Sequence, residues 1–251
     1  MKLLSAVLLL WLAAGCSTTG NNEQQSSVDS DASAKIHTEL AAVYYGQQRY
    51  GVALDELKIA TSMNDKYAPA YGVRGLVYMS LLEDKKAEAD FKRSLDLDSS
   101  DSGTRNNYGW FLCQRGRLSE SMEQFMAAVK NPLYATPEKA FLNAGLCSSK
   151  FGKLADAETY LQRALSIHPK MAEALEGMAE LSFAKADYAG AKTYFLRLSR
   201  IGAELSASDL LLAARVEHKL GDRNAEASYK LQLRKRFPDS RETQLMLSGE
   251  R

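Results

Sequence analysis

Cysteine and histidine are the residue types in this chain with the widest chemical range, and each occurs three times. A thiol can attack a substrate, bind a metal, accept a lipid or form a disulfide, and an imidazole can move protons or bind a metal. The histidines are His37, His168 and His218, and none has a ligand partner at the spacing of a metal site. No G-x-S-x-G motif presents a nucleophilic serine. The sequence therefore predicts neither an enzyme nor a protein with a metal or other cofactor.

Cys16 ends an apolar run that opens the chain. Residues 1–15 read MKLLSAVLLLWLAAG, and this run is shorter than the roughly 20 apolar residues of a membrane-spanning helix. One positive charge before a short apolar stretch is typical of a secretory signal peptide. The segment Leu-Ala-Ala-Gly-Cys resembles the lipobox of bacterial lipoproteins, although Ala13 stands where leucine is usual. Two other interpretations are a plain signal peptide with a coincidental cysteine and a buried N-terminal helix.

The lipobox resemblance implies that residues 1–15 are removed as a lipoprotein signal peptide. Cys16 then becomes the first residue and carries fatty acyl chains such as palmitate. Ser17 follows it, where aspartate would favour retention in the inner membrane. The expected location is therefore the periplasmic face of the outer membrane. Residues 16–33 hold few apolar side chains, and such a segment cannot offset the entropy cost of ordering, so we expect a lipidated cysteine followed by a flexible tether.

The overall composition is that of an ordinary globular protein without an electrostatic bias. The 251 residues are 45% hydrophobic and 25% charged, and the formal net charge is +1. A nucleic-acid-binding domain normally carries a basic surplus, so no nucleic acid partner is expected. Alanine and leucine are plentiful while valine and isoleucine are few, which favours helices over a large sheet.

From residue 34 onward the sequence repeats itself about every 34 residues. The segments RYGVALDELKIATSM, KKAEADFKRSLDLD and KLADAETYLQRALSIHP share small and large apolar residues at matching spacings. This pattern resembles the tetratricopeptide repeat, a helix-turn-helix unit whose neighbours stack into a superhelix. We therefore expect an all-α superhelix of about six repeats over residues 34–239, followed by a capping segment at 240–251. The alternative is an irregular helical bundle.

The first helix of each tetratricopeptide repeat lines a concave face, so the resemblance implies a groove there. Exposed apolar patches mark binding sites, and six residues at the groove positions of the first four repeats define a candidate partner-binding groove: Tyr45, Leu76, Met79, Trp110, Leu142 and Leu146. The alternative is that the superhelix is tight and these side chains bury one another. In the fifth repeat, Glu173, Glu176 and Glu180 form an acidic stripe that either receives a basic segment or faces solvent.

The two remaining thiols, Cys113 and Cys147, fall in the first helices of consecutive repeats. Such helices are neighbours in the stack, and the predicted compartment is oxidising. One expectation is a disulfide that ties the third repeat to the fourth. The other is that both residues are small buried apolar side chains.

A lipobox, a polar segment and six repeats in 251 residues resemble the PilF/PilW family of type IV pilus biogenesis lipoproteins, or pilotins. Segments such as RNNYGWFLCQRGRLSESMEQFMAAVKNPLY are similar to repeats of that family. The resemblance implies that the protein binds subunits of the type IV pilus secretin and promotes their localisation and multimerisation in the outer membrane, which pilus biogenesis and twitching motility need. The residues alone indicate a lipid-anchored protein-binding scaffold without a small-molecule substrate. Alternatives are an adaptor for peptidoglycan enzymes and a periplasmic peptide-binding chaperone.

Overall fold

The structure is a computed structural model that describes the backbone of residues 19–249 and the side chains of residues 30–249. Throughout this range the chain forms helices joined by short connections, with no β-strand. The helices are α1 (Thr19–Gly46), α2 (Tyr50–Met63), α3 (Ala68–Ser80), α4 (Asp84–Leu97), α5 (Ser102–Gln114), α6 (Leu118–Lys130), α7 (Pro137–Lys150), α8 (Leu154–Ile167), α9 (Ala172–Ala184), α10 (Tyr188–Arg200), α11 (Ala207–Leu220), α12 (Arg223–Arg236) and α13 (Arg241–Ser248). The predicted all-α fold class is therefore confirmed.

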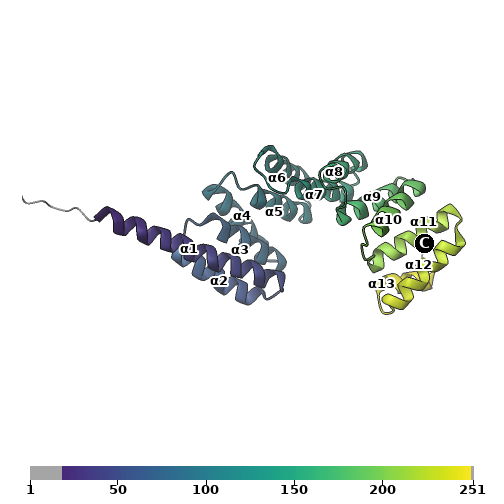
Figure 1. Cartoon of the computed structure of the whole chain (residues 1–251), viewed down its shortest axis with the longest axis horizontal. Helices are drawn as coiled ribbons and strands as arrows, with labels where there is room; N and C mark the ends of the chain where they lie inside the picture. Colours follow the sequence, from purple (N-terminus) through teal and green to yellow (C-terminus); the bar gives the residue numbers. More distant parts are fainter. Residues whose placement is uncertain (1–18, 250–251) are drawn as a thin grey trace, which may run out of the picture.

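The helices are arranged as an arch of stacked pairs (Figure 1). Each odd-numbered helix from α1 to α11 packs against the even-numbered helix that follows it, and we call these the A and B helices. Successive A helices also contact one another, whereas no contact joins two B helices in residues 19–249. The A helices therefore line the inner curve and the B helices the outer curve, as expected for a superhelix of six repeats.

Glycine allows the two helices of a repeat to approach closely at equivalent positions on the A helices. A Cβ atom added to Gly75 would lie 2.8 Å from the ring of Phe91, and one added to Gly109 would lie 2.7 Å from the ring of Phe125. Gly145 occupies the same position in the next repeat and leaves equally little space. The rings of Phe91 and Phe125 are fully buried. The small and large residues of the repeat are thus matched across each helix pair, which is why they recur together in the sequence.

The connections from one repeat to the next have two lengths. Those before α3, α5 and α9 hold four residues, whereas residues 131–136 before α7 and residues 201–206 before α11 hold six. In the repeat pattern of the sequence, two additional residues follow residue 135, which matches the first six-residue connection, whereas the pattern places no additional residues before α11. The second is harder to detect because the last A–B turn is shortened to Gly221 and Asp222, so α12 begins 35 residues after α10 and the pattern shifts by only one residue.

The start of α1 differs from the tether that the sequence predicts. Residues 1–18, and with them Cys16, lie outside the described residues, but residues 19–33 are helical and continue into the first repeat. Ala34 and Ala41 are buried and fix the helix there, and adding a residue to an existing helix gains one hydrogen bond for each residue fixed. This extension carries α1 beyond the stack (Figure 1). Within the described range, no helix combines the length and apolar character needed to cross a bilayer.

A short helix covers the other end of the stack, within the predicted capping segment. Helix α13 begins after Ser240, whose side chain accepts a hydrogen bond from the backbone N–H of Thr243. The Thr243 hydroxyl in turn donates to the carbonyl of Phe237 at 2.7 Å. Helix α13 contacts both α11 and α12. The last repeat is therefore partly covered, as the ends of repeat stacks generally are.

The turn between α3 and α4 holds a leucine in a conformation that favours glycine. Leu82 has a φ of 60°, while Gly116 and Gly152 adopt positive φ at the equivalent turns. The left-handed region costs a non-glycine residue roughly 1–2 kcal/mol, and the Leu82 side chain is 76% exposed. After allowing for the greater chain entropy of glycine, we expect Leu82→Gly to raise the free energy of unfolding by about 0.5–1 kcal/mol.

Urea unfolding of Leu82→Gly and of Gly116→Ala measures this difference. Gly116 has a φ of 83°, and a Cβ atom added to it meets open space. The alanine at position 116 should therefore destabilise the protein through its backbone alone, by about 1 kcal/mol. A loss of stability in Leu82→Gly would show that its side chain packs in a way that the exposed fraction does not reveal.

Candidate partner-binding surfaces

The six predicted groove residues all lie on A helices, and they pack into four different apolar clusters. Leu142 is buried and the other five are half-buried. Leu76 and Met79 pack into one apolar cluster around Phe91 and Leu112. The remaining residues belong to three other clusters: Tyr45 in that of the first repeat, Trp110 in that around Phe125, and Leu142 with Leu146 in that of the fourth and fifth repeats. These side chains therefore contribute mainly to contacts between neighbouring helices.

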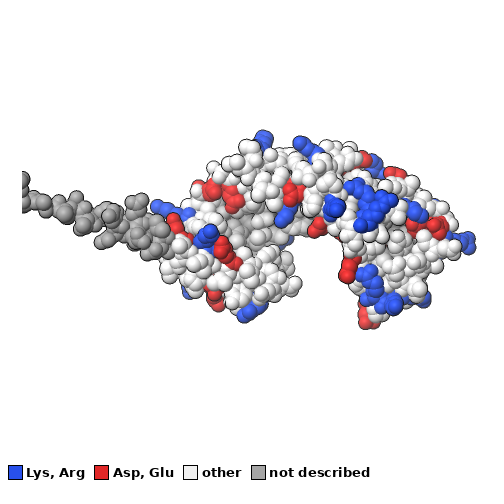
Figure 2. Space-filling view, in the orientation of Figure 1, with Lys and Arg blue, Asp and Glu red and all other residues white. Residues whose placement is uncertain are grey.

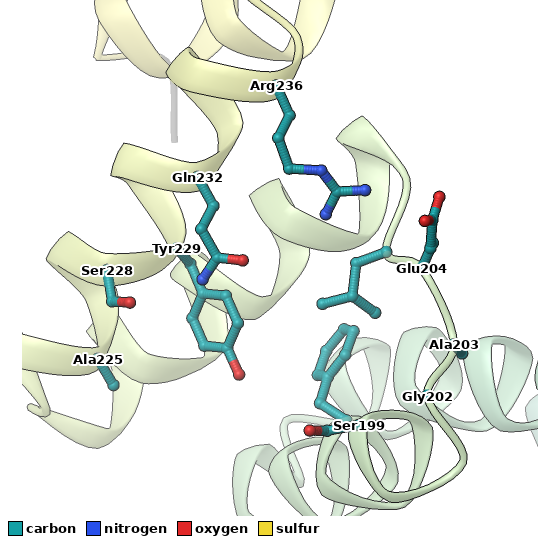
Figure 3. A pocket seen from close by; sticks show the side chains of 11 residues that line it. Ser199, Gly202, Ala203, Glu204, Ala225, Ser228, Tyr229, Gln232 and Arg236 are labelled. Atoms are coloured by element: carbon teal, nitrogen blue, oxygen red, sulfur yellow. The ribbon is translucent and has the colours of Figure 1, made fainter.

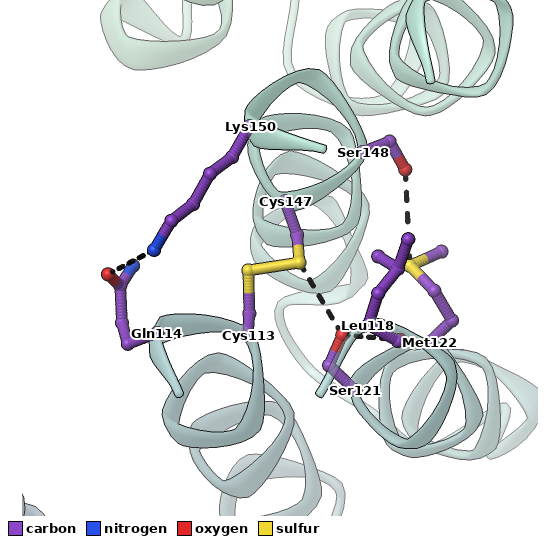
Figure 4. Close-up of a disulfide and its surroundings, with 8 residues drawn as sticks. All are labelled: Cys113, Gln114, Leu118, Ser121, Met122, Cys147, Ser148 and Lys150. Atoms are coloured by element: carbon purple, nitrogen blue, oxygen red, sulfur yellow. Dashed lines mark hydrogen bonds between the residues drawn. A yellow bond between two sulfur atoms is a disulfide. The ribbon is translucent and has the colours of Figure 1, made fainter. Parts of the chain in front are cut away.

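Cys113 and Cys147 form a disulfide that joins α5 to α7 (Figure 4). Their Cα atoms lie 6.0 Å apart, and both side chains are fully buried. Across the same two helices, Lys150 donates a hydrogen bond to Gln114 at 3.0 Å. Of the two alternatives that the sequence left open, the structure contains the disulfide, and it links two A helices of the inner curve covalently.

The inner curve becomes acidic toward the fifth repeat. Glu173 and Glu180 on α9 are exposed and Glu176 is half-buried. Partial burial raises the pKa of the Glu176 and Glu180 carboxyls, and the nearby Asp209 carboxylate raises both further. The Asp209 carboxylate helps to cap the start of α11, where it accepts a hydrogen bond from the backbone N–H of Ser206 at 2.9 Å. The stripe is therefore a region of like charge that does not favour another anion.

The histidines take part in local contacts. His37 Nδ1 lies 2.6 Å from Glu56 Oε2, which links α1 to α2, and His218 Nδ1 lies 3.1 Å from Glu226 Oε2, which links α11 to α12. His168 caps the end of α8. Within the described residues, no group of three or more histidine, cysteine or acidic side chains could hold a metal ion.

An exposed apolar stripe on α1 is the surface that sequence reasoning missed. Ile36, Leu40 and Val43 follow one another along one face of the helix, and they are 56%, 40% and 57% exposed. The residues one repeat later at the positions of Ile36 and Val43 are Ala70 and Val77, which are fully buried. Ala70 and Val77 pack in an apolar cluster with residues of α2, the B helix that precedes them. Among the described residues, no B helix precedes α1.

We call Ile36, Leu40 and Val43 the open face of α1. Their spacing follows the helical period, so the sequence does contain the signal. The residue one repeat after Leu40 is Arg74, which pairs with Asp90 on α4 of its own repeat, so the comparison with a covered A helix applies to Ile36 and Val43. The open face therefore lies at the end of the stack where one more helix could pack.

Stacked helix pairs with an inner curve of A helices define a protein of the tetratricopeptide-repeat class, and the model of a tetratricopeptide repeat matches residues 68–101. The chain belongs to the PilF/PilW family of type IV pilus biogenesis proteins. It is 35% identical to PilW, described as a widely conserved type IV pilus biogenesis factor, whose crystal structure it matches with a TM-score of 0.79 over 85% of this chain and 98% of that one.

A second relative supports the same assignment over almost the full length. The chain is 28% identical to the type IV pilus assembly protein PilF of Pseudomonas aeruginosa over 243 residues, which cover 95% of this chain and 96% of the relative. The structure of Pseudomonas aeruginosa PilF matches with a TM-score of 0.78 at 27% identity, over 88% of this chain and 100% of that one.

Proposed function

We propose that the protein acts in type IV pilus biogenesis as a lipid-anchored scaffold of the outer membrane. In this role it binds secretin subunits and promotes their localisation and multimerisation. Three features support the proposal: membership of the PilF/PilW family, a repeat stack of the kind that binds other proteins, and the lipobox-like sequence that ends at Cys16. The observation that carries it is the open face of α1, because its exposed apolar side chains could pack against a partner.

The partner that fits the open face is an amphipathic helix of a secretin subunit. In each later repeat, the corresponding surface of the A helix is covered by the B helix before it, and the residues at positions 70 and 77 show how complete that burial is. A helix from the partner would occupy the place of this missing B helix. Its apolar face would meet Ile36, Leu40 and Val43 in the i, i+4, i+7 pattern by which helices dock into grooves.

The lipid anchor would hold this surface close to the membrane. Stable attachment needs more than one acyl chain, and a bacterial lipoprotein cysteine carries two or three. From Thr19 to Ile36 the chain is a continuous helix, which spans about 25 Å at 1.5 Å per residue. A scaffold fixed in this way raises the effective concentration of bound subunits at the membrane where they assemble. The half-buried groove residues on α3, α5 and α7 would add contacts only at their exposed edges.

A double substitution on the open face tests the proposal in cells. We expect Ile36→Glu with Val43→Glu to abolish secretin multimers in the outer membrane while the purified variant keeps its helical circular dichroism. Loss of an apolar contact at the centre of an interface commonly costs about 2 kcal/mol of binding free energy. Each 2 kcal/mol weakens the affinity by about 30-fold. The matched control is Leu231→Glu on α12, which is 57% exposed at the other end of the stack and should leave the multimers unchanged.

Multimers at the normal level in the double variant would contradict docking on the open face. Leu76 and Met79 are unsuitable for the same test because they pack against Phe91, and a charge there would disturb the fold. Pulldown with the native protein separates the functional alternatives. Recovery of a murein hydrolase would favour a peptidoglycan adaptor, and recovery of many unrelated unfolded chains would favour a chaperone.

A further inference from the structure

The two ends of the stack differ, because α1 exposes apolar side chains at one end and α13 covers the other. Helix α13 begins after Ser240, which stands 34 residues after Ser206, the residue that caps the start of α11. By this spacing α13 is the A helix of an incomplete seventh repeat. It has 8 residues, whereas α3, α5, α7, α9 and α11 have 13 or 14. Helix α13 therefore fills only part of the place of a complete A helix.

Few side chains hold α13 in this place. Leu245 and Met246 are half-buried, and they pack against an apolar cluster that contains Leu210, Leu211 and Leu233. The side-chain hydrogen bonds of α13 stay within residues 237–248. Among the side chains of residues 30–249, none forms a hydrogen bond or ion pair between α13 and α11 or α12. The helix is therefore held mainly by two apolar side chains and by its own cap.

The cluster beneath α13 is also in contact with the preceding repeat. Leu205 and Tyr229 pack against it, and both line a pocket between α10 and α12. In Figure 3 the Tyr229 side chain is directed toward Ser199 on α10. The cluster therefore meets the fifth repeat through Leu205 and Tyr229, and it meets α13 through Leu245 and Met246.

The open face of α1 stands at the positions by which an A helix packs on the repeat before it. The residues at the position of Ile36 in the later A helices are all buried: Ala70, Thr104, Ala140, Ala174, Asp209 and Thr243. Ile36 and Thr243 are therefore equivalent, and Thr243 is the buried residue of α13. The position equivalent to Val43 lies past Ser248, where α13 ends. Helix α1 thus offers an apolar contact that α13 is too short to make.

The charges favour pairing of unlike ends over pairing of two C-terminal ends. Figure 2 shows basic side chains gathered over the C-terminal half of the arch, and the last turn of α12 holds Arg234, Lys235 and Arg236. Within the described part of the chain, none of these three forms an ion pair. Two C-terminal ends would bring these like charges together, which is unfavourable. On α1, by contrast, Lys35 is paired with Glu39 at 3.9 Å.

We propose that the surface beneath α13 is a binding site for α1 of a second copy of this chain, and that α13 occupies the site as an intramolecular competitor. When α13 is displaced, the open face of α1 takes the place of the seventh A helix and two stacks join head to tail. Such a contact does not close on itself, so it can extend into a filament. A seated α13 keeps the chains separate and leaves the open face of α1 available to a different partner.

Two complementary variants test for this contact. The acceptor chain ends at Asp239, so it lacks α13, and it carries Ile36→Glu with Val43→Glu. The donor chain keeps α13 and the native open face. Both carry Cys16→Ser, so neither acyl chains nor a disulfide through this residue can link them. In sedimentation velocity we expect each chain alone to be monomeric and an equimolar mixture to form a 1:1 complex.

The effect of α13 is measured by restoring it to the acceptor. The donor should bind the truncated acceptor about tenfold more tightly or better than the same chain with α13, because a seated competitor lowers the apparent affinity by the fraction of open sites. A second acceptor keeps its full length and carries Leu245→Glu with Met246→Glu, which should also allow pairing. Its matched control is Leu247→Glu, on the same helix but 68% exposed, which should leave α13 seated.

A mixture that stays monomeric, with both acceptors shown to be folded by their helical circular dichroism, would overturn the proposal. Self-association of the donor alone would mean that two open faces pair with each other, and self-association of the acceptor alone would mean that two C-terminal ends pair. Either result would contradict head-to-tail stacking. The measurement contains no secretin, so its outcome is independent of the secretin multimers that test the proposed function.

Discussion

Loss of the Cys113–Cys147 disulfide is expected to lower the free energy of unfolding by about 3–4 kcal/mol. The two cysteines are 34 residues apart in sequence, and closing a loop of this length restricts the unfolded chain to that extent in the chain-entropy model. The bond also joins two A helices that are neighbours in the stack, so its loss would loosen the third repeat from the fourth. Urea unfolding of the native protein with and without a thiol reductant measures the effect.

The double variant Cys113→Ala with Cys147→Ala separates the bond from other effects of the reductant. Both side chains are buried among apolar residues, so alanine leaves no polar group without a partner. The variant should be destabilised as the reduced protein is, and the reductant should change its unfolding curve no further. A reduced native protein that unfolds at the same urea concentration as the oxidised one would show that packing alone holds α5 against α7.

The features that could be predicted from the sequence are those that repeat locally. Gly75, Gly109 and Gly145 recur opposite large B-helix residues because the helices of each repeat touch there, and the recurrence of small and large residues at one spacing indicates the fold without any long-range information. The placement of Cys113 and Cys147 on adjacent A helices follows from the same pattern. Repeat architectures are unusually readable in this way because each unit contacts only its neighbours.

The features that could not be predicted depend on what lies outside the repeating unit. Ile36 and Val43 stand where Ala70 and Val77 are buried one repeat later, and the position of α1 at the end of the stack leaves them exposed. The six groove residues were placed correctly on A helices, but their burial depends on how tightly successive repeats close.

Replacement of Phe125 by alanine is expected to cost about 3–5 kcal/mol of stability, as truncation of a buried phenylalanine commonly does. Its ring is fully buried and fills the space beside Gly109, where a Cβ atom would lie 2.7 Å from it. The same contact makes Gly109→Ala unfavourable by about 1–3 kcal/mol through overpacking, although alanine is the better helix former by about 1 kcal/mol.

The two substitutions should compensate each other because they act on one contact. In the Phe125→Ala background the ring is gone, so Gly109→Ala should cost much less than it does alone, and a double-mutant cycle measures the coupling. Gly51→Ala is the matched control, because a Cβ atom at that helical position meets open space and should stabilise the protein slightly. An equal cost of Gly109→Ala in both backgrounds would mean that this glycine is needed for another reason, such as its approach to the Ser121 carbonyl at 3.1 Å from the added Cβ. The matched small and large positions would then not explain why the repeats pack as they do.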